Sequence, residues 1–312
     1  SYSLAALTGL LLVLIHPDPN LVELTPFVLV PILVASANEA DWRQRFLMGW
    51  LAGILQWGGM CYWIRDTLAT HGGMGGGVAL LLFVLFSLAK GLHLAVFSTL
   101  AGPMFGLRWA PPFAALLWVG LERTHGNLGF IWLPIGNAAL EMSLPMRLAP
   151  VLGVYGISFV FALMSASVAG WWMRRDRWQL AFCIPLFGLW LLPALPEVQV
   201  GKLSAVTVQP NVPEDVVFSD EQLHEVYEQI AKRTLAMSID SRRGKTDLLL
   251  WPEMPASLYY ELDAPFREQT RSLARLAKAP FLFGTVRFAA NSEPFNTAQL
   301  LDSTGKAQGV YD

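Results

Sequence analysis

Hydrophobic residues are distributed unevenly along the chain, and their pattern divides it into two parts. Up to residue 196 the sequence consists of long apolar runs separated by short polar segments. A helix that crosses a membrane needs roughly 17–25 mainly apolar residues. By that criterion the pattern predicts about seven membrane-spanning helices, at 1–15, 21–37, 46–65, 76–101, 110–124, 150–173 and 178–196.

The pattern changes from residue 197 to residue 312, where short apolar strands alternate with amphipathic helices. It predicts strands at 202–209, 247–251 and 281–288, helices at 219–240 and 264–278, and a strand, a Ser-Thr-Gly turn and a further strand over 295–312. This order of elements is typical of a layered α/β domain. We therefore expect a transmembrane bundle over 1–196 and an α/β domain over 197–312.

Composition and charge support the same division. The chain is 54% hydrophobic and 15% charged, and 18 of its charged residues fall in 1–196 against 28 in the shorter 197–312. The net charge of −2 and the lack of a basic stripe exclude a nucleic-acid partner. Cys61 and Cys183 both lie in apolar runs, so we expect neither a disulfide framework nor a metal site.

Positive charges indicate how the predicted spans are oriented. Alternate short loops carry Arg43 and Arg45, then Arg108, then the run Arg174, Arg175 and Arg177. Loops enriched in Lys and Arg stay in the cytoplasm. The N-terminus is then inside, and the seventh span delivers residue 197 onward to the outer face, which is the periplasm in a bacterium with two membranes.

Two features of the predicted membrane part are open to two interpretations each. Lys90 and His93 lie one turn apart inside the fourth span. They either form a functional site or, in the interpretation that we favour, face the bundle interior or extend toward a lipid headgroup. Residues 125–149 are apolar and aromatic but rich in Gly and Pro, which fits a re-entrant segment lining a cavity or an ordinary interface belt.

Glu253 is the candidate catalytic residue of the second part. It follows the apolar run 247–251 directly after Pro252, which ends the predicted strand. A carboxylate at the end of a buried strand suits a general base. Position alone favours the other interpretation, a strand-end glutamate paired with an arginine.

A resemblance to a known family changes that balance. The segment LLLWPEMPA, which contains Glu253, resembles the glutamate motif of the nitrilase superfamily in the membrane-anchored form of the apolipoprotein N-acyltransferases. Further segments are similar to that family in the same order, with Ile131 where proline is usual and Phe295 where tyrosine is usual. They are GWLAGILQWGGMCYWIRDTLATHGGM, LERTHGNLGFIW, LAPVLGVYGISFV, VTVQPNVPED and FNTAQLLDSTG.

The resemblance implies a fold and a site. The fold is an eight-span bundle bearing a periplasmic α-β-β-α nitrilase-like (CN hydrolase) domain, and the triad is Glu, Lys and Cys, of which only the glutamate falls on this chain, at Glu253. The family's lysine follows a Tyr-Asp or Tyr-Asn pair, and Tyr311-Asp312 ends the sequence. We therefore expect a fragment of a longer protein, inactive by itself.

Two further residues match family positions. Trp132 matches the tryptophan of the Gly-Phe-x-Trp segment and either lines a lipid entrance or belongs to an interface belt. Asn296 matches the asparagine of the Tyr-Asn-Thr strand and either orients the site or bonds its own loop.

The function that the resemblance implies is the transfer of an acyl chain from a phospholipid to the N-terminal diacylglyceryl-cysteine of apolipoproteins, through a thioester and without a cofactor. The partners are the phospholipid donor, the apolipoprotein acceptor and membrane lipids, and the location is a bacterial inner membrane. The alternatives are a membrane-anchored nitrilase-fold amidase or hydrolase, and a non-enzymatic transporter supported only by Lys90 and His93.

Overall fold

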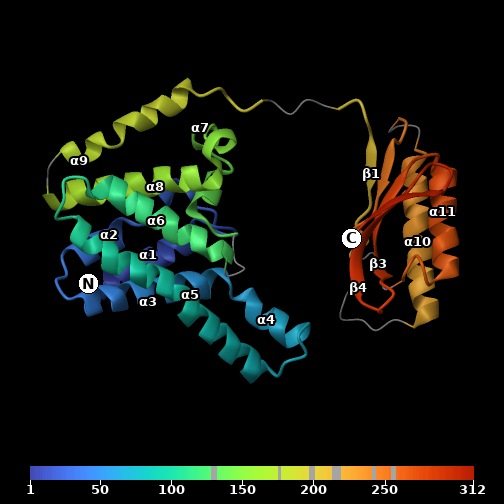
Figure 1. Ribbon diagram of the computed structural model, residues 1–312, viewed down its shortest axis with the longest axis horizontal. Coiled ribbons are helices and arrows are strands. Elements are labelled where there is room, and N and C mark those ends of the chain that lie inside the picture. The colour runs from blue at the N-terminus through green and yellow to red at the C-terminus, as the bar shows by residue number, and fades with distance from the viewer. Residues whose placement is uncertain (128–131, 175–176, 197–200, 213–218, 241–243, 254–257) are drawn as a thin grey trace. The chain divides into compact units, whose positions relative to one another are not determined.

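The computed structural model describes residues 1–127, 132–174, 177–196, 201–212, 219–240, 244–253 and 258–312. The chain forms two compact units, Ser1–Glu197 and Val198–Asp312. The first unit is helical and the second combines a sheet with two helices, as Figure 1 shows for each unit.

The first unit contains α-helices of very different lengths. They are α1 Tyr2–Leu14, α2 Val30–Ala37, α3 Trp42–Met60, α4 Trp63–Thr70, α5 Gly76–Met104, α6 Ala110–Asn127, α7 Ser143–Met146, α8 Ala149–Arg174 and α9 Trp178–Ala181. Short 3-10 helices connect some of them: η1 Val22–Phe27, η2 Ile135–Ala139 and η3 Ile184–Leu191.

Two of the described helices, α5 and α8, are long and apolar enough to cross a membrane. The other predicted spans meet shorter or interrupted helices. The one at 21–37 is divided between η1 and α2, the one at 46–65 breaks at Cys61 between α3 and α4, and the one at 178–196 consists of α9 and η3. Two apolar helices fit membrane association, and the count of seven crossings stays a prediction.

Helix α3 packs closely against α5 because glycines meet at the contact. A Cβ atom built on Gly53 would lie 2.6 Å from the Gly91 Cα and carbonyl oxygen of α5, closer than real side chains come. Small residues of this kind let helix backbones approach each other in membranes. The core of the unit is built from the inner faces of these helices and of α1, α2, α6 and α8.

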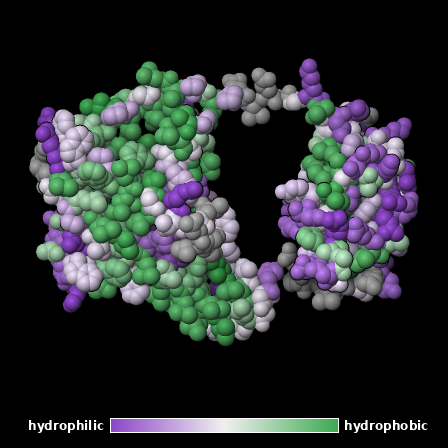
Figure 2. All heavy atoms as spheres, in the orientation of Figure 1, coloured by the Kyte–Doolittle hydropathy of each residue, from purple (hydrophilic) through white to green (hydrophobic). Residues whose placement is uncertain are grey.

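The outer face of α5 is apolar and uncovered in the first unit. Leu80, Leu81 and Leu85 are 49%, 58% and 50% exposed, and Figure 2 shows the hydrophobic surface of this unit. Apolar exposure on this scale is unusual for a soluble surface. It fits contact with lipid tails.

The second unit is built on one five-stranded mixed sheet with the strand order β1-β2-β3-β4-β5. The strands are β1 Ala205–Thr207, β2 Leu248–Leu250, β3 Phe281–Phe288, β4 Pro294–Leu301 and β5 Ala307–Tyr311. The pairs β1-β2 and β2-β3 are parallel, and β3-β4 and β4-β5 are antiparallel. The predicted strands and helices of this part are confirmed, with β1 shorter than expected.

The two faces of this sheet differ in how they are covered. Helices α10 Asp220–Ser238 and α11 Ala264–Ala277 lie on one side of it (Figure 1), over a core that includes Leu249, Phe281 and Phe283. The alternate residues point to the other face, where the register aligns Leu250, Leu282 and Leu300 in one row across three strands. All three are only partly buried, so this second face carries an apolar row without a helix over it among the described residues.

Candidate functional site

The chain that follows β2 is fixed from two directions before it reaches Glu253. The Trp251 indole donates to Thr234 Oγ1 of α10 at 2.9 Å, and the Trp251 amide donates to the Leu282 carbonyl of β3 at 3.0 Å. The next carbonyl, that of Pro252, accepts from the Gly284 amide at 3.1 Å. The backbone of Glu253 is therefore held against β3, while its side chain is exposed.

Glu253 and Asn296 meet, although 43 positions separate them in the sequence. The Asn296 Nδ2 amide donates to Glu253 Oε1 at 2.5 Å. Asn296 lies on β4 opposite Val286 of β3, and by alternation it shares the uncovered face with Leu300. The structure thus brings two of the three predicted site residues together on the open side of the sheet; their roles stay predictions.

A second polar group lies at the same end of β4, on the opposite, helix-covered face by alternation. Asp312 accepts a hydrogen bond from Thr297 Oγ1 at 2.6 Å and forms an ion pair with Arg287. The Thr297 hydrogen bond, assisted by the Arg287 guanidinium, holds the pKa of Asp312 below its usual value. Sequence reasoning missed this group, and only the strand register could have found it, because Thr297 lies on β4 and Asp312 directly follows β5.

Trp132, the third predicted site residue, belongs to the helical unit. It is 58% exposed, and its carbonyl accepts from the Asn137 side-chain amide at 2.6 Å. Together with residues of the α1–η1 loop it lines a cavity of about 520 Å³. Residues 129–131, which precede it in the matched segment, lie outside the described residues.

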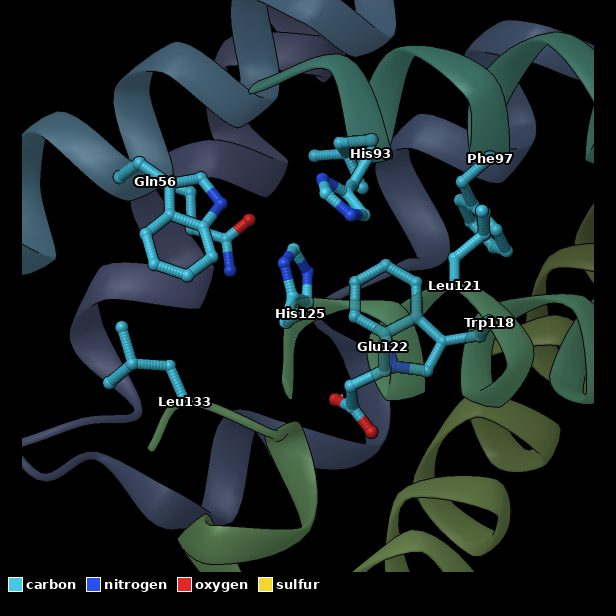
Figure 3. Close-up of a pocket in the computed structure, with 10 residues that line it drawn as sticks. Gln56, His93, Phe97, Trp118, Leu121, Glu122, His125 and Leu133 are labelled. Carbon is cyan, nitrogen blue, oxygen red and sulfur yellow. The ribbon is translucent and has the colours of Figure 1, made fainter. Parts of the chain in front are cut away.

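Lys90 and His93 face the inside of the helical unit. Lys90 is 5% exposed, with its ammonium 4.5 Å from the centre of the Trp57 ring. The His93 ring stacks on His125 of α6 at 3.8 Å, and its Nε2 is 2.9 Å from Thr124 Oγ1. Figure 3 shows the narrow pocket that these histidines share with Gln56 and Glu122.

Glu122 is a buried polar residue that sequence reasoning did not single out. It is 5% exposed, and its Oε1 accepts from the Ile135 amide at 2.7 Å and from the Trp118 indole at 3.2 Å. Ile135 begins η2, so this carboxyl group ties the segment after Trp132 to α6. The available signal was the one carboxylate of helix α6, at the end of its apolar run.

The described residues contain no group of three or more His, Cys, Asp or Glu side chains that could hold a metal ion. Cys61 is buried in the helical unit and Cys183 is partly buried there. The candidate site on the uncovered face is defined by the Glu253 carboxylate and the Asn296 amide.

The fold and the site define a class of protein: a membrane-associated helical unit joined to a mixed-sheet unit with a strand-end carboxylate. Residues 8–167, just over half of the chain, match the family described as apolipoprotein N-acyltransferase N-terminal domain. The chain belongs to this family.

Curated relatives agree with the match. The chain is 27% identical to an apolipoprotein N-acyltransferase of Geobacter metallireducens, over 100% of this chain and 62% of the relative. It is 27% identical to the proteins of that name from Chlorobaculum tepidum (91% of this chain, 55% of the relative) and Pseudomonas syringae pv. tomato (97% and 63%). The chain thus spans between half and two thirds of the length of these relatives.

Proposed function

We propose that this chain is part of an enzyme that transfers an acyl chain from a phospholipid to the N-terminal diacylglyceryl-cysteine of apolipoproteins. The family match supports the activity, and the hydrogen-bonded pair of Glu253 and Asn296 is the observation that carries the site. Glu253 is the general base, and Asn296 is the residue that orients it. The amide leaves Glu253 Oε2 available to accept a proton.

The reaction proceeds in two halves, following the family's Glu, Lys and Cys. The cysteine thiol attacks the phospholipid ester carbonyl, its proton passes to Glu253, a C–S bond forms, and the lysophospholipid leaves with a proton. The acceptor amine then attacks the thioester, Glu253 takes the amine proton, and the thiol is released. Dividing the transfer through a covalent intermediate lowers each barrier, and the lysine stabilises the oxyanion.

The strand register favours a place for that lysine. Tyr311 pairs with Ala298 in the antiparallel ladder of β4 and β5. Continued by two residues along β4, the same register sets the position after Asp312 opposite Asn296. The family places its lysine directly after a Tyr-Asp or Tyr-Asn pair, so a lysine there would lie beside Glu253. The complete gene sequence tests this: a residue other than lysine at that position contradicts the proposed triad.

The uncovered sheet face supports an α-β-β-α nitrilase-type fold for the complete protein. Leu250, Leu282 and Leu300 form an apolar row on the face that lacks helices among the described residues. In a sandwich, two sheets pack through such faces about 10 Å apart. We propose that a second sheet covers this row, with Glu253 at its margin.

We further propose a multi-pass location in a bacterial inner membrane, with residues 197–312 on the periplasmic side. Two observations support this arrangement: the apolar helices α5 and α8, and the positively charged loops with Arg43, Arg45 and Arg108. In the third positively charged loop, Arg175 lies outside the described residues. Both substrates are lipids, which a membrane bundle can admit laterally. Trp132 lines the lipid entrance in this proposal.

Replacing Glu253 by glutamine in the complete gene product tests the assignment. The glutamine side chain keeps the size and the hydrogen bond but cannot accept a proton, and the loss of general base catalysis costs about 10²–10⁴-fold. We expect acyl-enzyme formation from a labelled phospholipid, normalised to folded protein, to fall by at least about 10²-fold. Near-wild-type acylation in the Gln variant would mean that Glu253 is not the base. Release of free fatty acid by the unsubstituted enzyme, without transfer to the acceptor, would favour the hydrolase alternative.

A further inference from the structure

The cavity beside Trp132 is large enough for a ligand and is built from two segments that are distant in sequence. Its volume of about 520 Å³ falls in the range of small-molecule sites. One wall is the α1–η1 loop with His16, Asp18 and Asn20, and the other is the stretch from Trp132 to Glu141. In the proposed topology both segments are loops on the outer side of the membrane.

The polar groups that line this cavity are hydrogen-bond acceptors. Asp18 and Glu141 contribute exposed carboxylates. Asn137 uses its Nδ2 to donate to the Trp132 carbonyl, so its Oδ1 remains as an acceptor. No Lys or Arg from the described part of the chain lines the cavity.

His16 adds a buried acceptor to this set. It is 5% exposed, and its Nδ1 lies 2.9 Å from the Leu12 carbonyl, which can only accept, so Nδ1 carries a hydrogen. Its Nε2 makes no hydrogen bond within the described residues. Burial lowers the pKa of His16, against the carbonyls of Leu12 and Pro134, which favour the protonated ring. When the ring is neutral with Nδ1–H, Nε2 carries a lone pair that can accept a hydrogen bond.

An acceptor-rich cavity selects a ligand by its charge and its donors. Two carboxylates repel an anion, whereas they attract a cation, and the exposed ring of Trp132 adds a cation–π surface. A quaternary ammonium has charge but no N–H groups for these acceptors, so a primary ammonium fits better. The apolar residues Ile15, Leu133 and Leu140 line the same cavity and suit the acyl part of a lipid.

We propose that this cavity binds the primary ammonium group of a lipid, with Asp18 and Glu141 as counter-ions and Asn137 and His16 as acceptors. Two lipids can supply that group: the ethanolamine headgroup of a phospholipid, and the free α-amine of a lipid-modified cysteine. The choice of these two lipids as sources rests on the proposed function, whereas the binding of a primary ammonium group rests on the cavity alone.

The test measures binding by the purified chain in detergent micelles, without turnover. The probes are short-chain phosphatidylethanolamine, phosphatidylcholine and phosphatidylglycerol, and a diacylglyceryl-cysteine peptide with a free or an acetylated α-amine. We expect the ethanolamine lipid or the free-amine peptide to bind about 10-fold more tightly than its counterpart without N–H⁺ donors, which corresponds to ~1.4 kcal/mol. Preference for the ethanolamine lipid identifies the headgroup, and preference for the free amine alone identifies the acceptor.

The paired substitution Asp18→Asn and Glu141→Gln should reduce this selectivity to within about 2-fold, because only charge is removed. Asp66→Asn is the matched control, since Asp66 is also an exposed acid of the helical unit but does not line the cavity. The inference is overturned if the chain binds ethanolamine and choline lipids equally and also binds the free and acetylated peptides equally. It is also overturned if the paired variant keeps the full selectivity. Because binding is measured without chemistry, a failure of Glu253 as base leaves this result unchanged.

Discussion

Gly284 of β3 lies directly against the backbone of Glu253. The Gly284 amide donates to the Pro252 carbonyl, and a Cβ atom at position 284 would lie 1.7 Å from the Glu253 carbonyl oxygen. No side chain can occupy that space without moving the main chain. The glycine therefore determines how closely the candidate base approaches the sheet and the Asn296 amide.

Gly284→Ala should displace Glu253 while leaving the helix-covered core intact. A misplacement of about 1 Å at a catalytic group can cost about 10²-fold in rate, so we expect acyl-enzyme formation by the complete gene product to fall by about that factor. Gly309→Ala in β5 is the matched control, because a Cβ there meets nothing within 4 Å. Equal activity of the two variants, at equal folded amounts, would argue against a role for this contact.

Asp302 makes the hairpin between β4 and β5 sensitive to acid. Its carboxylate accepts from the Thr304 hydroxyl and amide, the Lys306 amide and the Gln308 side chain. The Thr304 hydroxyl and the Lys306 amide contribute most to lowering the pKa of Asp302 to about 2. The stabilisation is present above the ordinary value near 3.8 and is lost as the pH falls toward 2.

Asp302→Asn should weaken the hairpin at neutral pH and reduce this acid dependence. Hydrogen exchange of the β5 amides, followed in the whole chain between pH 5 and pH 2.5, measures both effects. Protection of the β5 amides, taken relative to the intrinsic exchange rate at each pH, that falls equally with acid in the variant and in the wild type would show that another group controls the hairpin.

Glu122 should contribute to stability through its two buried hydrogen bonds. Glu122→Ala leaves the Ile135 amide and the Trp118 indole without their acceptor, and unpaired buried donors cost about 1–3 kcal/mol each. Glu122→Gln keeps one acceptor oxygen and should lose less. Thermal unfolding in detergent ranks the variants, with Asp66→Asn as an exposed control; a Gln variant as unstable as the Ala variant would indicate that the carboxyl group itself is required.

The sequence predicted the elements of the second unit well because each has a clear period. Strand β3 alternates between the two faces, and Pro252 ends the segment before Glu253, so local pattern placed both. The contact between Glu253 and Asn296 could not be derived in this way. It depends on the register of β3 with β4, and a shift by one residue would turn Asn296 to the other face.

The helical unit was harder to predict because hydropathy does not show where a helix breaks. The apolar run 46–65 includes the interruption at Cys61, and the run 178–196 contains Pro185 within the 3-10 helix η3. The stacking of His93 on His125 was equally hidden, since these residues belong to different helices. Lys90 and His93 drew attention through their charge alone, without indicating their neighbours.

The last prediction concerns the side of the membrane on which Glu253 works. The final apolar stretch, Trp178–Leu191, is 14 residues long. It would extend ~21 Å as an α-helix or ~28 Å as a 3-10 helix, against a hydrocarbon core of about 30 Å. The crossing is therefore short, and the proposed periplasmic location depends on it.

Reporter fusions after residue 202 decide the location. We expect a reporter that is active only in the periplasm to be active there, and a cytoplasmic reporter to be silent, because Arg174 and Arg177 favour a cytoplasmic loop before this stretch. A fusion after residue 45, which retains Arg43 and Arg45, is the control and should give the opposite result. If both fusions report the cytoplasm, the last stretch does not cross, and the candidate base would face away from lipids displayed on the outer leaflet.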